Sequence, residues 1–410
     1  MAILLIYIGI ALVPFFIWPG FDSRFPKEIL GLGLALSISL VAIYKGQLRP
    51  FKNFWFLLFI LFSFLCILMA PHFKEYVLAH INGNKMELLL NRPTPNLWMF
   101  KSSYYFMVYF LMFVTVASLP IREYQVKNIL TAMAVCGVLM SLYVFVQAVG
   151  FDPIFKIAPN TLNPDIKDLD RPNIGGFMGQ ATVVAPFIAM TVPLCLYLRR
   201  YVCAGVSTVA VVLTMSKVGL AALVIGVVFF LMSADRKFYK LAVLMIFAGA
   251  LITCSTYLKD KNIFYPKQII AQLSSESSGR FEAWTQIVEL MSKDIEGRKR
   301  LVAGIGPGSF PYFFSVKNNN TWWQAHCDPM ELVINFGLIG AGLFFFGIRR
   351  TVINAYQNKN NMIFGILASL LVLVSSSFGT FSLQMAPNIF DAIVLAGLLN
   401  NNSFLKREII

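Results

Sequence analysis

Long apolar runs recur along the whole chain and are separated by short connectors rich in charged residues, proline and glycine. The runs are roughly 16 to 22 residues long, close to the length that a helix needs to cross the hydrocarbon of a bilayer. Inside lipid only helices and closed barrels satisfy their backbone hydrogen bonds, and these runs lack the alternation of barrel strands. The pattern therefore predicts an all-α integral membrane protein with about twelve transmembrane helices.

The predicted crossings divide the chain into three parts. Residues 1–258 hold transmembrane helices 1–9, residues 259–328 form a large outer loop with amphipathic helices, and residues 329–410 hold helices 10–12. The stretch 201–233 is too long for one crossing, and basic residues at both of its ends favour two helices joined by a turn at 214–217. The expected crossings lie near 2–19, 29–44, 53–70, 104–119, 128–149, 180–198, 201–215, 218–233, 241–258, 329–348, 362–381 and 385–403.

The composition fits this class, because 58% of the residues are hydrophobic and 13% are charged, whereas soluble domains carry about 25% charged residues. We therefore expect a lipid bilayer around the chain and no nucleic-acid partner. The run 1–19 has neither a basic region before it nor a small-residue cleavage pattern, which favours a retained membrane anchor. The six cysteines form no Cys-x-x-Cys pair, which favours packing over disulfide or zinc chemistry.

Basic residues are concentrated in alternate short connectors, and this sets the expected orientation. Basic residues in short loops stay on the cytoplasmic side of a membrane. We therefore expect both termini in the cytoplasm and the long connectors 71–103, 150–179 and 259–328 on the outer side. The inner connectors carry the basic residues Lys45, Arg49, Lys52, Arg122, Lys127, Arg199, Arg200, Arg236, Lys237, Lys240, Arg349, Arg350, Lys359, Lys406 and Arg407 and the acidic residues Glu123, Asp235 and Glu408.

A specific anion site on the outer side must rest on a few placed cations, because acidic and basic residues nearly balance there. Lys217 interrupts the apolar stretch LTMSKVGLAAL at the membrane boundary, where an ionisable group is costly. Its ammonium could face the diphosphate of a lipid-linked substrate. The alternative is a lysine at a helix end that extends to the headgroups.

Arg280 and Arg171 are the other candidate cations. Arg280 lies in SSGRFEAWTQIVELM, whose apolar positions follow a helical spacing and predict an amphipathic helix that begins after Ser277 or Ser278. A cation in the first turn opposes the helix macrodipole, and a guanidinium suits bidentate phosphate contact. A solvated arginine is the alternative. Arg171 lies in LDRPNIGGFMGQ, and Asp391 in the last predicted helix could pair with one of these cations.

The segment GIGPGSF spaces three glycines at Gly304, Gly306 and Gly308. It has neither the Lys-Ser/Thr of a phosphate-binding loop nor a preceding strand. We interpret it as a tight turn that sets the spacing between the Arg280 helix and the segment that follows.

Of the three histidines, His326 has the most informative setting. Asp328, Pro329 and Glu331 follow it in the pattern of an N-cap, a first helical residue and a capping box. A rigid helix start would fix the direction of the imidazole, and neutral histidine is the usual general base for a hydroxyl. A structural histidine near a cap is the alternative. Zinc is disfavoured because adjacent residues point in different directions, and we expect no metal and no cofactor.

The order of these motifs resembles the O-antigen ligase and polymerase superfamily. The elements are TMSK (214–217), GRFEAW (279–284), GIGPGSF (304–310) and HCDPMELVINFGLIG (326–340), and RPNIGGFMGQATVVAPFIAM is similar to the segment Gly-Thr-Phe-x-Asn-x-Asn of that family. The resemblance covers about 171–345. The family usually carries arginine where this chain has Lys217, and asparagine where it has Cys327.

The resemblance implies a helical bundle related to the metal-independent C-type glycosyltransferases of the bacterial inner membrane. Such proteins transfer a glycan from undecaprenyl diphosphate to an acceptor hydroxyl at the periplasmic face, and the acceptor is a glycan, lipid A core or a protein. By this resemblance His326 is the base, and Arg280 with Lys217 holds the diphosphate. We expect Arg171 to be a further diphosphate contact, and Asp328, Glu331 and Gly306 to support the site.

Within the family, the ligase reading is favoured over the polymerase reading. A transporter or lipid flippase is the alternative from another class, but the chain shows no inverted repeat and its notable charges lie at the outer rim rather than at the midplane. A scaffold without catalysis is hard to reconcile with Lys217, Arg280 and His326 in family order.

Overall fold

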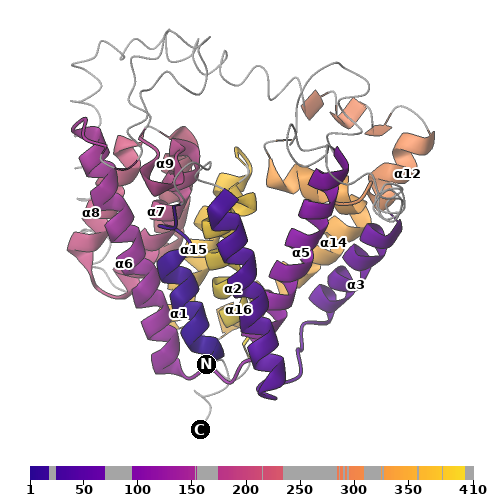
Figure 1. Cartoon of the computed structure of the whole chain (residues 1–410), viewed down its shortest axis with the longest axis horizontal. Coiled ribbons are helices and arrows are strands. Elements are labelled where there is room, and N and C mark those ends of the chain that lie inside the picture. The colour runs from indigo at the N-terminus through magenta and orange to yellow at the C-terminus, as the bar shows by residue number, and fades with distance from the viewer. Residues whose placement is uncertain are drawn as a thin grey trace.

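The computed structural model is helical throughout the residues that it describes, so the predicted all-α class is confirmed for them. The helices stand side by side, and the amino terminus lies at the end of the bundle opposite α12 (Figure 1). The described residues are 1–17, 25–69, 95–152, 154, 174–214, 216–233, 284–285, 287–289, 291–292, 295–308, 325, 327–357, 360–380 and 382–401.

Apolar helices make up the bundle, and short turns join several of them. The α-helices are α1 (Ala2–Leu12), α2 (Phe25–Tyr44), α3 (Phe54–Met69), α5 (Pro95–Ser118), α6 (Glu123–Ala148), α7 (Ala181–Tyr197), α8 (Tyr201–Leu213), α9 (Lys217–Ser233), α12 (Ile295–Ala303), α14 (Asp328–Gln357), α15 (Asn361–Ser377) and α16 (Ala386–Leu399), and the 3-10 turns are η1 (Gly176–Met178) and η2 (Ser382–Gln384).

Three described stretches are long and apolar enough to cross a membrane by length and composition, namely Pro26–Tyr44, Glu123–Ala148 and Asp328–Gln357. Shorter apolar helices accompany them. Each predicted crossing coincides with a described helix except 241–258, which lies outside the described residues. Residues 201–233 form two helices, as predicted, while the total number of crossings stays a prediction.

Helix α7 forms the centre of the larger group of helices, with α6, α8, α9 and α15 packed around it. Its side chains from Val183 to Leu196 are buried. Close approach of α9 depends on Gly219, because a Cβ at this position would overlap the Cβ of Ala185. Small residues at helix contacts are typical of membrane bundles, where apolar burial does not by itself favour association of helices.

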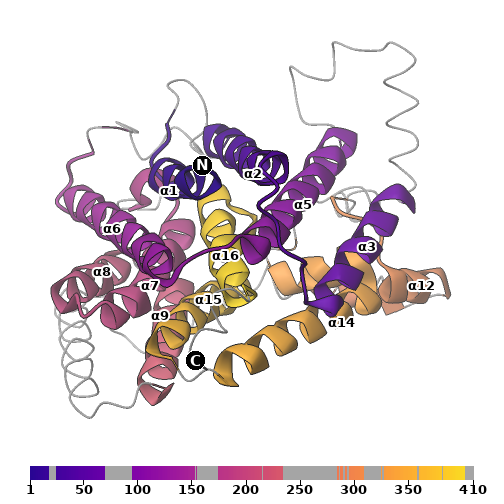
Figure 2. The ribbon, with the colours of Figure 1, turned by 90° about the horizontal axis from the view of Figure 1, so that it is seen from below.

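Helices α3 and α14 lie beside each other on the other side of the bundle, away from α6–α9 (Figure 2). Aromatic rings join the two helices to each other and to α5: Phe59 of α3 packs edge-on against Phe336 of α14 at a centroid distance of 5.4 Å, and Phe56 of α3 packs against Phe113 of α5 at 5.0 Å. Such edge-to-face pairs stabilise by about 1 kcal/mol beyond the area that they bury. The pair that carries the start of α14 is therefore anchored to the bundle.

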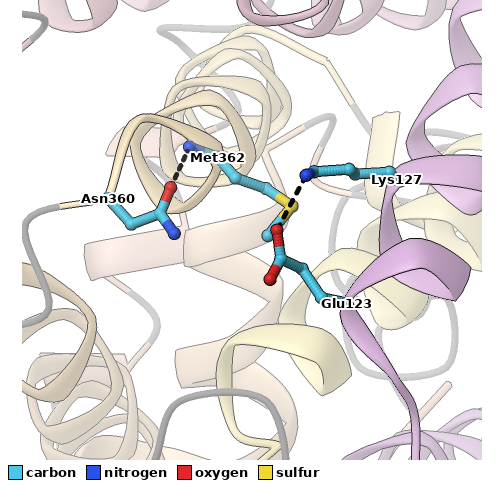
Figure 3. A network of polar contacts seen from close by, with 4 residues as sticks. All are labelled: Glu123, Lys127, Asn360 and Met362. Carbon is cyan, nitrogen blue, oxygen red and sulfur yellow. Dashed lines mark hydrogen bonds and ion pairs between the residues drawn. The ribbon is translucent and has the colours of Figure 1, made fainter. Parts of the chain in front are cut away.

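Polar contacts mark the edge of the bundle at which α1 begins and α16 ends. Lys127 forms an ion pair of 2.8 Å with Glu123 one helical turn before it, and the side chain of Asn360 accepts a hydrogen bond of 2.8 Å from Met362 N at the start of α15 (Figure 3). Asn401 Nδ2 donates to the carbonyl oxygens of Val116 and Leu119. The start of α1 and the end of α16 thus lie at the same edge of the bundle. The assignment of that edge to the cytoplasmic side stays a prediction.

Helix α14 is interrupted at Gly337, which has a φ of 66° and a ψ of −177°. This left-handed φ is a conformation that glycine adopts at little cost. The interruption separates a short first segment, which begins at Asp328, from the long apolar segment that continues to Gln357. Asp328 and Glu331, two of the three residues predicted to support the site, lie on the short segment.

Candidate functional site

The structure describes some of the predicted site residues and not others. Lys217, Gly306, Asp328 and Glu331 are described, and they lie toward the end of the bundle opposite the start of α1, which we call the outer edge. The remaining predicted site residues, Arg171, Arg280 and His326, lie outside the described residues, so their proposed roles stay predictions.

Lys217 is the first residue of α9, and its side chain is exposed. The hydroxyl of Ser216 accepts a hydrogen bond of 3.2 Å from Gly219 N, as an N-cap residue does. A cation at this position opposes the positive end of the helix macrodipole, so the helix gains nothing from it. The start of α9 is therefore capped by Ser216, and the exposed side chain of Lys217 follows this cap directly.

Helix α9 meets the turn between α15 and α16 beside Lys217. A Cβ on Gly379 would lie 2.7 Å from Val218 Cγ2, so the side chain of Val218 packs directly against the Gly379 backbone. The hydroxyls of Ser376 and Ser382 lie 2.7 Å apart and tie the turn to the end of α15. We call residues 378–385, except the undescribed residue 381, the outer turn.

The outer turn also contacts the start of α14. Leu383 N donates a hydrogen bond of 2.9 Å to one carboxylate oxygen of Asp328, and Gln384 Nε2 donates one of 3.0 Å to the other. Gln384 Nε2 also donates one of 2.6 Å to Glu331 Oε2. One turn thus contacts both the start of α9 at Lys217 and the two acids that follow His326.

Both residues that flank His326 are held by hydrogen bonds. Ala325 N donates to Glu331 Oε1 at 2.8 Å, and Trp284 Nε1 donates to Ala325 O at 2.8 Å. On the other side, Glu331 N donates to Cys327 O at 3.0 Å. The backbone on each side of the histidine is therefore anchored, one side of it to the segment that contains Trp284.

The start of α14 differs from the capping box that the sequence predicts. Asp328 accepts its hydrogen bonds from the outer turn rather than from its own helix, and the first helical hydrogen bond runs to Cys327 O. Glu331 reaches back to Ala325 N instead of Asp328 N. The reason is that Leu383 N and the Gln384 amide supply donors to the carboxylates from another part of the chain.

A small apolar cluster supports this arrangement. Ile287, Met291, Ala325 and Ile334 are buried together, with Trp284, Leu301, Ile305 and Met330 packed against them. The described residues between 284 and 292 are helical, as predicted. Val288, which the predicted apolar stripe included, is 58% exposed, so the buried stripe is narrower than expected.

The glycine turn docks on the interruption of α14. Breaking the helix at Gly337 removes the usual donors for the preceding carbonyls. Ile305 N donates to Ile334 O at 2.9 Å, and Gly306 N donates to Asn335 O at 3.0 Å, so the turn supplies the missing donors. A Cβ on Gly304, where φ is +84°, would overlap Asn335 O.

The carboxylates of Asp328 and Glu331 are bridged by an amide, and within the described part of the chain no lysine or arginine forms an ion pair with either. Asp391 is paired with no lysine or arginine among the described residues, and its buried Oδ2 has no hydrogen-bond partner there, while Arg171 and Arg280 lie outside the described residues. Burial raises the pKa of the Cys327 thiol.

The sequence patterns did not point to Gln384 or to Tyr105, whose hydroxyl donates a hydrogen bond of 2.9 Å to Gln384 O. The only local signal was the polar group Ser382-Leu383-Gln384 before a proline-containing helix start, which is also typical of an ordinary connector. Trp284 lay within a motif, but no pattern indicated that its indole contacts the residue before His326.

These features define a multi-pass helical membrane protein with a polar site at one edge of the bundle. Residues 202–345 match the family model described as O-antigen ligase, and no curated protein matches the chain at a significant level. The match confirms the resemblance and supports membership in the O-antigen ligase family. The match supports a function of the O-antigen ligase and polymerase type in general terms.

Proposed function

We propose that this chain is a metal-independent glycosyltransferase of the bacterial inner membrane. It transfers a glycan from undecaprenyl diphosphate to an acceptor hydroxyl at the periplasmic face and acts as a ligase on lipid A core or a similar acceptor. The observation that carries the proposal is the outer turn, which contacts both the start of α9 beside Lys217 and the acids that hold the segment of His326.

Chain connectivity supports the participation of Arg280. Trp284 is bonded to Ala325, and His326 follows Ala325 directly. Four residues span at most about 14 Å even when fully extended, so the backbone of Arg280 must lie within that distance of Trp284.

Helix lengths support a lipid-linked donor. Helix α8 has 13 residues, which corresponds to about 20 Å, whereas the hydrocarbon of a bilayer is about 30 Å thick. If Arg199 and Arg200 hold the inner end of α8 at the headgroups, the turn before Lys217 lies below the outer headgroup level. At that depth the charged end of a lipid is a more suitable partner for the ammonium than a free sugar.

The proposed reaction is a single displacement. The acceptor hydroxyl oxygen attacks the anomeric carbon of the first sugar, and the bond from that carbon to the diphosphate oxygen breaks. His326 takes the hydroxyl proton, and undecaprenyl diphosphate leaves with the electron pair of the broken bond. Lys217, Arg280 and Arg171 neutralise the charge that develops on the leaving group, and the anomeric configuration is inverted.

The test is surface glycan display in cells that lack the protein, complemented with His326→Ala or with the wild-type chain. We expect the variant to display no ligated glycan at normal protein abundance. The chain offers two matched controls, His72→Ala and His80→Ala in the first predicted outer loop, which should restore display. Full display with His326→Ala would refute the assignment of the base.

A purified assay separates the ligase from the polymerase reading. The protein is incubated with a lipid-linked glycan, with or without lipid A core. Product on lipid A core supports the ligase, whereas longer chains that remain on undecaprenyl diphosphate support the polymerase. The ligase is favoured because the family match is described as O-antigen ligase.

A further inference from the structure

We propose that Gln384 is a positioning residue for the transfer reaction, which fixes the segment of His326 by bridging Asp328 and Glu331. This inference rests on the proposed function. Gln384 lies in η2, outside the matched residues 202–345, so the family match does not assign it a role.

The bridge uses the full donor capacity of one side chain. A glutamine amide has two N–H donors on its nitrogen. Gln384 Nε2 lies 3.0 Å from Asp328 Oδ1 and 2.6 Å from Glu331 Oε2, so one N–H is available for each carboxylate. The other oxygen of Glu331 accepts from Ala325 N at 2.8 Å. Two consecutive hydrogen bonds therefore connect Gln384 to the residue before His326.

Gln384 is itself held from several helices. The hydroxyl of Tyr105 on α5 donates to Gln384 O at 2.9 Å, and the hydroxyls of Ser376 and Ser382 lie 2.7 Å apart. Hydrogen bonds through the outer turn therefore connect the start of α14 to α5 and α15.

The charges make the amide the critical group in the bridge. Within the described residues no cation is paired with Asp328 or Glu331, so the amide is what separates two carboxylates. A group without N–H donors at position 384 would leave two carboxylate oxygens facing each other. We expect them to move apart and to displace Ala325 with them.

The first variants are Gln384→Glu, which keeps the shape but removes the donors, and Gln384→Met, which keeps the length without charge. We expect kcat to fall by about tenfold or more, because small displacements of catalytic groups cost large factors in rate. The KM for the lipid-linked donor should stay within about twofold, because Lys217 is untouched. A Gln125→Glu variant at the opposite edge, where the side chain accepts from Arg122 N, is the matched control and should be unaffected.

An exchange variant tests the contact itself. In Gln384→Glu combined with Glu331→Gln, the new amide keeps an oxygen for Ala325 N and points its N–H donors at position 384. The number of carboxylates is the same as in the natural chain. Asp328 Oδ1 still lacks its donor in this variant, so the recovery is partial, and we expect kcat of the double variant to exceed that of Gln384→Glu by about fivefold, a coupling of the size that neighbouring residues show. A structural role alone would not produce this recovery.

The same purified assay includes His326→Ala, so that failure of the positioning role of Gln384 can be distinguished from failure of the proposed function. If His326→Ala is inactive while Gln384→Glu keeps its kcat, the positioning role is refuted and the proposed function stands. If His326→Ala is fully active, the proposed function fails. The role of Gln384 is also refuted if the exchange variant is no more active than Gln384→Glu. It is likewise refuted if the loss of kcat is matched by an equal loss of folded protein in thermal unfolding.

Discussion

The indole nitrogen of Trp284 donates a hydrogen bond of 2.8 Å to the carbonyl oxygen of Ala325, a residue 41 positions later in the chain. This bond joins the segment of one family motif to the residue directly before the histidine of another. The partly buried indole packs against the cluster of Ile287, Met291 and Ile334, so the bond is fixed by apolar packing as well.

Replacing Trp284 with phenylalanine removes the donor and keeps most of the ring. We expect a loss of about 1 kcal/mol in the free energy of unfolding, because Ala325 O loses its partner. Glycan transfer should fall more than the amount of folded protein, because the histidine segment loses one of its anchors. The measurement is transfer per folded molecule, with Val288→Ala, at a side chain 58% exposed on the same segment, as the control. Equal activity of Trp284→Phe and the natural chain would contradict the prediction.

Substitutions of Lys217 distinguish two roles for its side chain: contact with a phosphate of the donor, or extension to the headgroups without such a contact. Lys217→Arg should retain or improve transfer, because a guanidinium keeps the charge and adds bidentate geometry. Lys217→Met should raise the KM for the lipid-linked donor by about tenfold, the effect of about 1.4 kcal/mol of binding. The measurement is steady-state kinetics with varied donor.

Lys127→Met, which removes an exposed lysine from the opposite edge, is the control for Lys217→Met and should leave the KM for the donor unchanged. Complete inactivation by Lys217→Arg would argue against a phosphate contact. An unchanged KM in Lys217→Met would show that the ammonium does not hold the donor.

The glycine at the interruption of α14 should be intolerant of a side chain. Gly337→Ala would place a Cβ against Val302 O in a backbone with φ +66°, so we expect the variant to unfold at a lower temperature. Strain of this kind costs about 1–3 kcal/mol. Gly342→Ala on the same helix meets no atom within 4 Å and is the matched control. Because alanine favours helix over glycine, that control should be neutral or slightly stabilised, and similar unfolding temperatures for both variants would contradict the account of the interruption.

Chelation tests the expected independence from metal. If protein cations stabilise the leaving diphosphate, transfer by the purified protein should be the same in the presence and absence of ethylenediaminetetraacetate. The assay is run at several donor concentrations, so that a change in KM is also detected. Lost activity that added magnesium or manganese restores would refute metal independence.

The helices were predictable from the sequence because lipid imposes one simple requirement, a long run of apolar residues. Because successive crossings alternate in direction, the predicted helices placed Lys217, Asp328 and Glu331 at the same edge of the bundle. The paired helices at 201–233 followed from basic residues at both ends of the stretch.

The contacts that organise the site were not predictable in the same way. Gln384 bonds to Asp328 and Glu331 across 56 and 53 positions of the chain, and such tertiary contacts leave no periodic trace in one sequence. The expected capping box at Asp328 was wrong because donors from the outer turn satisfy its carboxylate. Val288 fitted the apolar periodicity but faces outward, because the cluster beneath the loop is small.

The interruption at Gly337 divides α14 into two helical segments. Carbonyls of the first segment are held by Ile305 and Gly306 instead of by the next helical turn. The long apolar segment after Gly337 can tilt in bilayers of different thickness. Because no continuous ladder of backbone hydrogen bonds joins the two segments, this tilt does not move the acids beside His326. The positions of Asp328 and Glu331 depend instead on the glycine turn and the outer turn, so a change in bilayer thickness leaves these two acids in place.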